Sequence, residues 1–342
     1  MTIQEAINQF INGESLSSEQ MQAVMREIMT GKASDAQIGG FLIALRMKGE
    51  TGAEILGAAR VMRELATKVE IDNAPLIDTV GTGGDSAGLF NVSTASALIV
   101  AAAGGKVAKH GNRSVTSNSG SADVLEAAGV RLDLSAEEVA RCVNEVGVGF
   151  MFAVNHHSAM KHAIGPRKEL AARTIFNLLG PLTNPANALH QVIGVFDPRW
   201  LPVFADVLQQ FGSKHVLCVS SADGLDEISI AGNTFVTELK DGHITSYEVT
   251  PADFGLPTHA LDSLKVATSE ESLQLIKAAL SGEHAAAADM LAINAGAAIY
   301  AGDLCARLQQ GVDMAQDAMG SGLALQKLQE LADFTTLLKA DK

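Results

Sequence analysis

Two glycine-rich loops constrain this chain more than any other feature of its sequence. The first, residues 81–85, follows an apolar stretch at 76–80 that predicts a strand, and the second, residues 111–120, follows a predicted strand at 106–109. Each loop leads into a predicted helix. Glycines let backbone N–H groups turn toward a ligand, and the first N–H groups of a helix lack partners and carry the positive end of its dipole. The pattern therefore predicts two anion-binding loops.

Polar side chains next to both loops add hydrogen-bond donors. Asn91, Ser93 and Thr94 begin the helix after the first loop, whereas Lys109 precedes the second loop and Arg113 lies within it. Because the second loop carries cations, the two loops together could hold a ligand that has phosphates at two places.

The first loop does not match two common nucleotide-binding motifs. Ser86 stands where G-x-G-x-x-G requires its last glycine, and the sequence contains no G-x-x-x-x-G-K-[ST]. The simpler alternative is a tight turn between strand and helix without a ligand. The polar side chains that follow the loop favour ligand binding over this alternative.

Charge and length limit the classes of protein to consider. A net charge of −14 argues against a broad nucleic-acid-binding surface, because binding to a phosphate backbone needs clustered Lys and Arg. An anionic substrate must therefore be held by local donors or by a metal ion. With 342 residues, of which 47% are apolar, the chain is long enough for two compact domains.

Cysteine usage and the first residues predict a cytoplasmic protein with no membrane association. The three cysteines are far apart and form no C-x-x-C pair, which is typical of packed thiols in a reducing compartment. The N-terminal sequence has no basic region followed by an apolar region, and the longest apolar stretch, 95–103, is far below the ~20 residues that span a bilayer.

The order of predicted elements indicates a small helical domain followed by an α/β domain. Residues 1–67 show spaced apolar residues and three capping boxes, at Ser17, Ser34 and Thr51, which predict four short helices. After Pro75, strand and helix patterns alternate, which predicts a central, mostly parallel sheet covered by helices. The predicted strands lie near 76–80, 106–109, 130–133, 148–153, 191–196, 215–220 and 234–239. Helical patterns follow at 158–179, 198–211, 270–280, 284–301 and 323–339.

Asp226 and Glu227 are the best metal-ligand candidates from residue type alone. They are adjacent carboxylates in a turn-like segment, and Mg²⁺ typically takes one or two carboxylates and fills its other positions with phosphate and water. A solvated acidic loop is the alternative. His156, His157 and His162 lack the spacing of a zinc site.

Four motifs in order, with the acidic pair downstream, resemble the signature of the anthranilate phosphoribosyltransferase family. They are Gly81-Thr82-Gly83-Gly84-Asp85, Asn91-Val92-Ser93-Thr94, Lys109-His110-Gly111-Asn112-Arg113 and Ser119-Gly120-Ser121-Ala122-Asp123-Val124-Leu125-Glu126. The likeness covers nearly the whole chain. It implies a helical domain at 1–70 to which 160–188 return, an α/β domain at 74–159 and 189–342, and a homodimer formed through the helical domain.

The resemblance also implies an activity and a set of binding residues. The enzyme would transfer the phosphoribosyl group of phosphoribosyl pyrophosphate (PRPP) to the amine of anthranilate, with Mg²⁺ as cofactor and with no side chain as obligatory general base. PRPP would be bound by Gly81, Thr82, Gly83, Gly84, Asp85, Asn91, Ser93, Thr94, Lys109 and Ser121. Anthranilate would be bound by Gly81, His110, Asn112, His157, Arg167 and Pro181, and the metal by Ser93, Asp226 and Glu227.

Two other functions stay open at this point. A pyrimidine nucleoside phosphorylase shares the fold family and also breaks a ribosyl bond, but it would carry other motifs in place of residues 109–113. A non-catalytic paralogue that binds nucleic acid is opposed by the net charge of −14 and by the acidic pair. For Arg167, which could bind a carboxylate in bidentate fashion, the alternative is a solvated basic helix face with Lys168 and Arg173.

Overall fold

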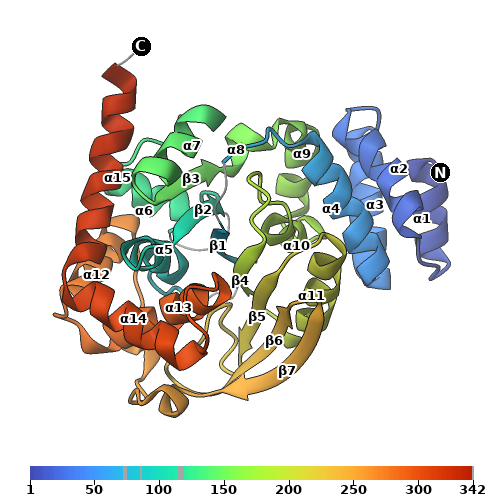
Figure 1. The fold of residues 1–342 in the computed structure, drawn as a ribbon. Coiled ribbons are helices and arrows are strands. Elements are labelled where there is room, and N and C mark those ends of the chain that lie inside the picture. Colours follow the sequence, from blue (N-terminus) through green and yellow to red (C-terminus); the bar gives the residue numbers. More distant parts are fainter. Residues whose placement is uncertain (72–74, 85–86, 115–118, 341–342) are drawn as a thin grey trace. The chain divides into compact units, whose positions relative to one another are not determined.

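The computed structural model describes residues 1–71, 75–84, 87–114 and 119–340 (Figure 1). The chain divides into two compact units. The first unit comprises Met1–Thr67 and Val154–Pro185, and the second comprises Lys68–Ala153 and Ala186–Lys342. The domain boundaries expected from the sequence, 1–70 with 160–188 and 74–159 with 189–342, stay a prediction. Among the described residues, no helix combines the length and apolar character that crossing a bilayer requires.

The first unit begins with the four predicted helices, each started by a capping box. Thr2, Ser17, Ser34 and Thr51 accept a hydrogen bond from the backbone N–H three residues later, and the Glu or Gln at that position bonds back to the cap. Helix α1 packs against α3 and α2 against α4 through their apolar faces. These helices are α1 Ile3–Ile11, α2 Ser18–Met29, α3 Asp35–Lys48 and α4 Gly52–Leu65.

The second part of the first unit is more broken than the sequence pattern predicted. The expected single helical stretch at 158–179 is interrupted, because one helix ends at Ala171, which has a left-handed backbone with φ 45°. The next helix starts where the Asn177 side chain accepts a hydrogen bond from the Thr174 N–H. The segment contains α8 Ala153–His156, α9 Lys161–Leu170 and α10 Phe176–Leu179, and 3-10 turns at Ser158–Met160 and Gly180–Leu182.

The second unit is built on a seven-stranded sheet in the order β3-β2-β1-β4-β5-β6-β7. The first five of these strands are parallel to their neighbours, whereas β6 and β7 are antiparallel additions at one edge. The predicted fold class, a helical domain plus a mostly parallel α/β sheet, is therefore confirmed. The strands are β1 Leu76–Gly81, β2 Lys106–Gly111, β3 Val148–Phe152, β4 His190–Gly194, β5 His215–Ser221, β6 Thr234–Lys240 and β7 His243–Val249.

The strand prediction was wrong in two places for physical reasons. Residues 130–133 form no strand, and the Arg131 N–H instead donates to the Thr335 hydroxyl on α15. Val130 and Leu134 are nevertheless buried in the core cluster of the second unit. Strand β7 escaped prediction because most of its side chains are exposed at the sheet edge, so its sequence lacks an apolar face.

Helices cover the sheet of the second unit. Helices α5 and α13 pack on β1 and on one another, and α11 packs on β5 and β6. Helix α14 was missed from the sequence, although it makes the most extensive helix contact of the unit, with α13. The helices are α5 Val92–Ala102, α6 Ser121–Ala127, α7 Ala136–Glu145, α11 Leu201–Gln210, α12 Ser269–Leu280, α13 Ala285–Ala301, α14 Leu308–Gly320 and α15 Leu323–Ala340.

Two glycines bring the backbones of α13 and α14 into direct contact. A Cβ atom on Gly296 would stand 2.6 Å from the Cα of Val312, and a Cβ on Gly311 would overlap the carbonyl oxygen of Gly296. No side chain fits between the helices at this point.

We therefore expect Gly296→Ala to lower the free energy of unfolding by about 1–3 kcal/mol, because the added methyl group must push two packed helices apart. Urea denaturation followed by circular dichroism measures this change. Gly320→Ala, at the end of α14, is the matched control, since a Cβ there meets nothing within 4 Å. Equal stability of the two variants would contradict the close packing.

Candidate functional site

The strand order reverses between β1 and β4, and the first glycine-rich loop leaves the sheet at this point. The chain runs from β1 outward to β2 and β3, and later from β4 outward to β5 on the other side. In open α/β sheets, ligands bind outside the carboxyl ends of the strands at such a reversal. The Thr82 N–H donates to the carbonyl oxygen of Gly194, 2.9 Å away, which joins the ends of β1 and β4.

The predicted acidic pair lies against this first loop. The backbone N–H of Gly83 donates to Oδ2 of Asp226 at 2.7 Å. A Cβ atom on Gly81 would overlap the Asp226 carboxylate, and one on Gly194 would overlap the Asp226 backbone. Gly83 has a positive φ of 67°, which also favours glycine. Glycine is therefore required here for close approach of backbone to carboxylate.

Asn294 on α13 fixes the segment that carries the acidic pair. This side chain is only 2% exposed, accepts from the Ile228 N–H at 2.9 Å and donates to the Ile228 carbonyl oxygen at 2.9 Å. Asn294 and Glu227 also line one small cavity together with Thr79 and Ser93. No local sequence signal marks Asn294, because its partner lies 66 residues away.

Lys109 places a cation inside the same region. Its side chain is 2% exposed, and Nζ donates to the Thr79 carbonyl oxygen at 2.5 Å and to Ser93 Oγ at 3.3 Å. Burial lowers the pKa of Lys109, and the negative charges of Asp78, Glu227 and Asp226 act in the opposite direction. The structure thus brings together the predicted residues Lys109, Ser93 and the acidic pair at the carboxyl end of β1.

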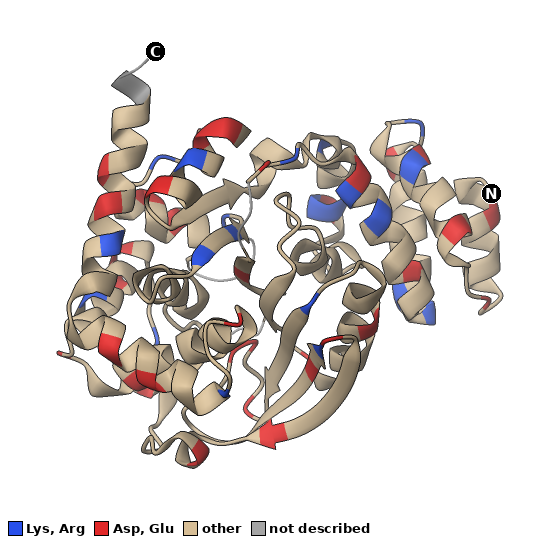
Figure 2. Cartoon of the chain, viewed as in Figure 1, with Lys and Arg blue, Asp and Glu red and all other residues tan. Residues whose placement is uncertain are grey.

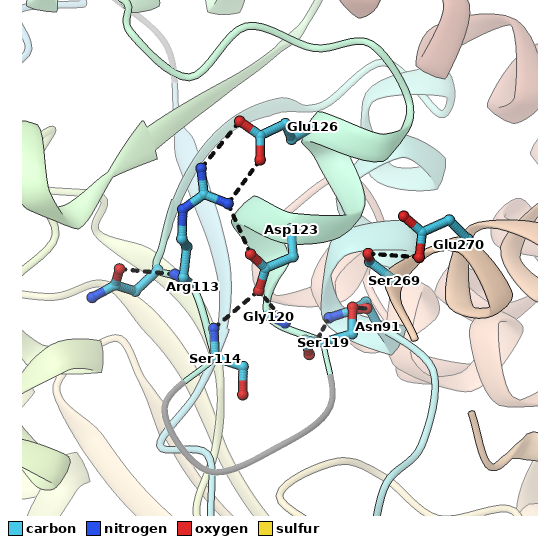
Figure 3. Close-up of polar contacts among 10 residues, drawn as sticks. Asn91, Arg113, Ser114, Ser119, Gly120, Asp123, Glu126, Ser269 and Glu270 are labelled. Carbon is cyan, nitrogen blue, oxygen red and sulfur yellow. Dashed lines mark hydrogen bonds and ion pairs between the residues drawn. The ribbon is translucent and has the colours of Figure 1, made fainter. Parts of the chain in front are cut away.

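Asp123 joins both described ends of the second glycine-rich loop (Figure 3). Its Oδ2 accepts from the Ser114 N–H at 3.1 Å and from the Gly120 N–H at 2.9 Å, and its Oδ1 accepts from Arg113 at 2.9 Å. Burial would raise the pKa of Asp123, but these hydrogen bonds and the Arg113 charge together lower it. The guanidinium of Arg113 also forms two hydrogen bonds with Glu126, so this predicted phosphate-binding cation is engaged with carboxylates.

The other predicted PRPP residues fall at the starts of α5 and α6. Asn91 precedes α5, and its side chain bonds to Ser119 instead of capping the helix. Thr94 is buried, and its hydroxyl has no hydrogen-bond partner among the described residues. Ser121 begins α6, and a Cβ on Gly111 would reach its Oγ at 2.5 Å. Gly84 has a positive φ of 81°, and Asp85 lies outside the described residues.

The predicted anthranilate residues are divided between the two units. His110 and Asn112 lie at the end of β2 and just after it in the second unit; the His110 N–H donates to Asp78 at 3.1 Å. His157, Arg167 and Pro181 belong to the first unit, where His157 and Pro181 are buried. The Arg167 guanidinium lies 5.1 Å from the centre of the Phe176 ring, and burial lowers the pKa of Arg167.

The donor set suits a hard divalent cation held partly by its ligand. Among the residues that the structure describes, no group of three or more His, Cys, Asp and Glu side chains could hold a metal by itself. Mg²⁺ commonly needs only one or two carboxylates when substrate phosphates complete its shell. Asp226 and Glu227, with the nearby Ser93 hydroxyl, meet that requirement in residue type.

Family comparisons cover both parts of the chain. The model of a glycosyl transferase family helical bundle domain matches residues 4–66, and that of a glycosyl transferase family a/b domain matches residues 73–325. Among curated proteins, the anthranilate phosphoribosyltransferase of Hahella chejuensis is 61% identical over 100% of both chains. That of Chromohalobacter salexigens is 59% identical over 99% of this chain and 98% of its own.

Solved structures agree with these sequence matches. Anthranilate phosphoribosyltransferase from Thermus thermophilus has a TM-score of 0.90 and 43% identity, and the alignment covers 97% of this chain and 99% of that one. The enzyme from Saccharomyces cerevisiae in complex with PRPP and Mg has a TM-score of 0.89 and 25% identity, with 98% of each chain covered.

The lowered pKa of Asp123 predicts a pH-dependent contribution to stability. A carboxyl group whose pKa is lower in the folded state stabilises the fold above its unfolded pKa of about 3.9, and this contribution is lost as pH falls through the folded pKa. We expect Asp123→Asn to cost about 1–3 kcal/mol at pH 7, since an Asn oxygen that accepts from both backbone N–H groups turns its NH₂ group toward the Arg113 guanidinium, where the carboxylate oxygen had accepted a charged hydrogen bond. The cost should shrink below pH ~4.

Urea denaturation of both proteins between pH 3 and 7 measures this difference. Asp313→Asn is the matched control, because Asp313 is an exposed helix residue bonded to Gln309 on its own helix. A cost for Asp123→Asn that stays constant over the whole pH range would contradict the assignment.

Proposed function

Because the chain belongs to the anthranilate phosphoribosyltransferase family, we propose how its two glycine-rich loops, its acidic pair and Arg167 bind the substrates of that reaction. The enzyme transfers the 5-phosphoribosyl group from PRPP to the amine of anthranilate and releases pyrophosphate, a step of tryptophan biosynthesis. The observation that best supports the proposed site is the convergence of Lys109, Ser93 and the acidic pair on the first loop, where the strand order reverses.

PRPP is bound in this proposal by the residues at the carboxyl ends of β1 and β2. The backbone of residues 81–84 binds the pyrophosphate and ribose, and Lys109 supplies a positive charge from within the protein. Side-chain donors at the starts of the following helices complete the site. These donors are Asn91, Ser93, Thr94 and Ser121, and Asp85 of the first loop is a further proposed contact.

Mg²⁺ is held in this proposal by Asp226, Glu227 and Ser93. Asp226 is oriented by the Gly83 N–H. Glu227 is followed by Ile228, whose backbone N–H and carbonyl oxygen are both bonded to the Asn294 side chain. When bound, the ion would neutralise charge on the pyrophosphate as it leaves. The bound Mg in the yeast relative supports the choice of metal.

Anthranilate is bound in this proposal through its carboxylate and its ring. Arg167 can form a bidentate pair with the carboxylate, because its planar guanidinium presents two parallel N–H groups. Burial beside the Phe176 ring restricts the geometry of this side chain. His110, Asn112, His157 and Pro181 are the other proposed contacts, with the backbone at Gly81.

The chemistry needs orientation and charge more than it needs proton transfer. The aromatic amine is uncharged at neutral pH and can attack C1 of the ribose directly, so no side chain is assigned as an obligatory base. The transition state should resemble an oxocarbenium ion with a departing anion. Lys109 and the loop amides then act by positioning PRPP and by stabilising the negative charge that develops on pyrophosphate.

A homodimer and a cytoplasmic location complete the proposal. The first unit exposes Ile11 by 71% and Met47 by 83%, at the ends of α1 and α3. Single exposed apolar side chains are also common on monomers, so the proposed homodimer rests mainly on the family resemblance. The location follows from the substrates, which are metabolites of a biosynthetic pathway.

The experiment that tests the function follows the fluorescence of anthranilate in the presence of PRPP and Mg²⁺. We expect consumption only when enzyme, PRPP and a divalent cation are all present, and strong inhibition by EDTA. Thymidine with phosphate serves as the comparison substrate pair. Phosphorolysis of thymidine without consumption of anthranilate would contradict the assignment and favour a nucleoside phosphorylase.

Steady-state kinetics test the proposed division of roles between Arg167 and the acidic pair. Arg167→Ala should raise KM for anthranilate by roughly tenfold or more, since it removes a charged hydrogen bond worth about 1.5–3 kcal/mol, and should leave KM for PRPP nearly unchanged. Asp226→Asn with Glu227→Gln should mainly lower kcat and shift the Mg²⁺ dependence to higher concentration. An equal rise of both KM values in both variants would refute this division.

A further inference from the structure

A serine from a distant helix holds Asn91 at the start of α5. Ser272 lies in the first turn of α12, 181 residues from Asn91, and its side chain is 0% exposed. Its Oγ donates to Oδ1 of Asn91 at 2.7 Å and accepts from the Asn91 backbone N–H at 3.0 Å. The sequence pattern did not indicate this contact.

Ser119 of the second glycine-rich loop holds the same amide from another direction. Its hydroxyl donates to Asn91 Oδ1 at 2.9 Å, and Nδ2 of Asn91 donates to the Ser119 carbonyl oxygen at 3.2 Å. Figure 3 shows Asn91 beside Ser119, with the first turn of α12 close to both. Asn91 therefore connects α5, the second loop and α12.

The hydrogen-bond capacity of Asn91 limits which way its amide can point. A carbonyl oxygen accepts two hydrogen bonds, and Oδ1 receives both, from Ser272 and Ser119. An amide nitrogen has two N–H donors, and only one of them donates to Ser119 among the described residues. If the amide rotated by half a turn, its oxygen would face the Ser119 carbonyl oxygen with no hydrogen between them, and both hydroxyl groups would have to turn from donating to accepting. The two serines thus fix the orientation of the remaining N–H group.

We propose that Ser272 is a positioning residue for PRPP, acting through the amide of Asn91. This inference rests on the proposed function, in which Asn91 contacts PRPP. Ser272 keeps the second N–H of Asn91 available to an anionic oxygen and ties the stem of the second loop to the start of α5. Helix α12 also packs against α6, so the three helices that begin around the two loops are joined here.

Loss of the Ser272 hydroxyl should mainly raise KM for PRPP. Ser272→Ala removes one of the two donors to Asn91 Oδ1 and leaves the partly buried Asn91 backbone N–H without its acceptor. We expect KM for PRPP to rise roughly tenfold, which corresponds to the loss of about one hydrogen bond with its orienting effect. KM for anthranilate should stay within about twofold, because both hydrogen bonds of the Ser272 side chain among the described residues go to Asn91, which is not assigned to that substrate.

Steady-state kinetics of the full-length enzyme, with thermal unfolding of each variant, test the proposal. Ser281→Ala is the matched control, since Ser281 is an exposed serine at the other end of α12, and it should behave as wild type. Ser272→Cys keeps the volume with a weaker donor, and we expect an intermediate KM for PRPP. It also keeps the test valid if Ser272→Ala unfolds.

A double-mutant cycle separates a positioning role from a merely structural one. If Ser272 acts through Asn91, then adding Ser272→Ala to Asn91→Ala should raise KM for PRPP no further. Additive effects, a rise of both KM values together, or a wild-type KM for PRPP in Ser272→Ala would overturn the inference. A wild-type enzyme that fails to consume anthranilate would instead refute the proposed function.

Discussion

The hydrogen bond from the Gly83 backbone to Asp226 is the contact on which the site depends. It joins two segments that are 143 residues apart, and it forms only because Gly81 and Gly194 have no side chains. The close approach brings a loop rich in backbone donors to an acidic pair. The sheet topology places the first loop at the reversal of strand order, where β1 and β4 are neighbours. The glycines leave the space that the Asp226 carboxylate occupies.

The sequence predicted what depends on local patterns and failed where long-range contacts decide. Capping boxes located helices α2, α3 and α4, and the glycine pattern located both loops, because each signal lies within a few residues. The strand expected at 130–133 was wrong because a backbone N–H of this segment, that of Arg131, bonds to the Thr335 side chain on α15 and to no neighbouring strand. Asn294 and Ser272 escaped notice because their partners are remote in sequence, and neither residue type is distinctive by itself.

The protein is acidic overall although its substrate PRPP is strongly anionic, so groups close to the substrate must offset the repulsion. Acidic residues occur in helices α14 and α15, as Figure 2 shows, and the net charge of the whole chain is −14. In the proposed site, backbone N–H groups and the buried cation of Lys109 would stabilise the anion, so the overall field matters less than the groups within a few ångströms. Arg113 of the second loop serves a different purpose, because it is paired with Asp123 and Glu126 and stabilises the ends of that loop.

The division of the first unit into two chain segments has a consequence for biosynthesis on the ribosome. Helices α2 and α3 pack against α9, and α4 packs against α10, yet α9 and α10 are translated only after β1, β2 and β3. Helices α2, α3 and α4 therefore leave part of their apolar surface uncovered while residues 68–153, the first segment of the second unit, are translated. Domains usually fold one after another from the N-terminus during translation, but here the first unit can be completed only after residues 68–153 of the second unit have been translated.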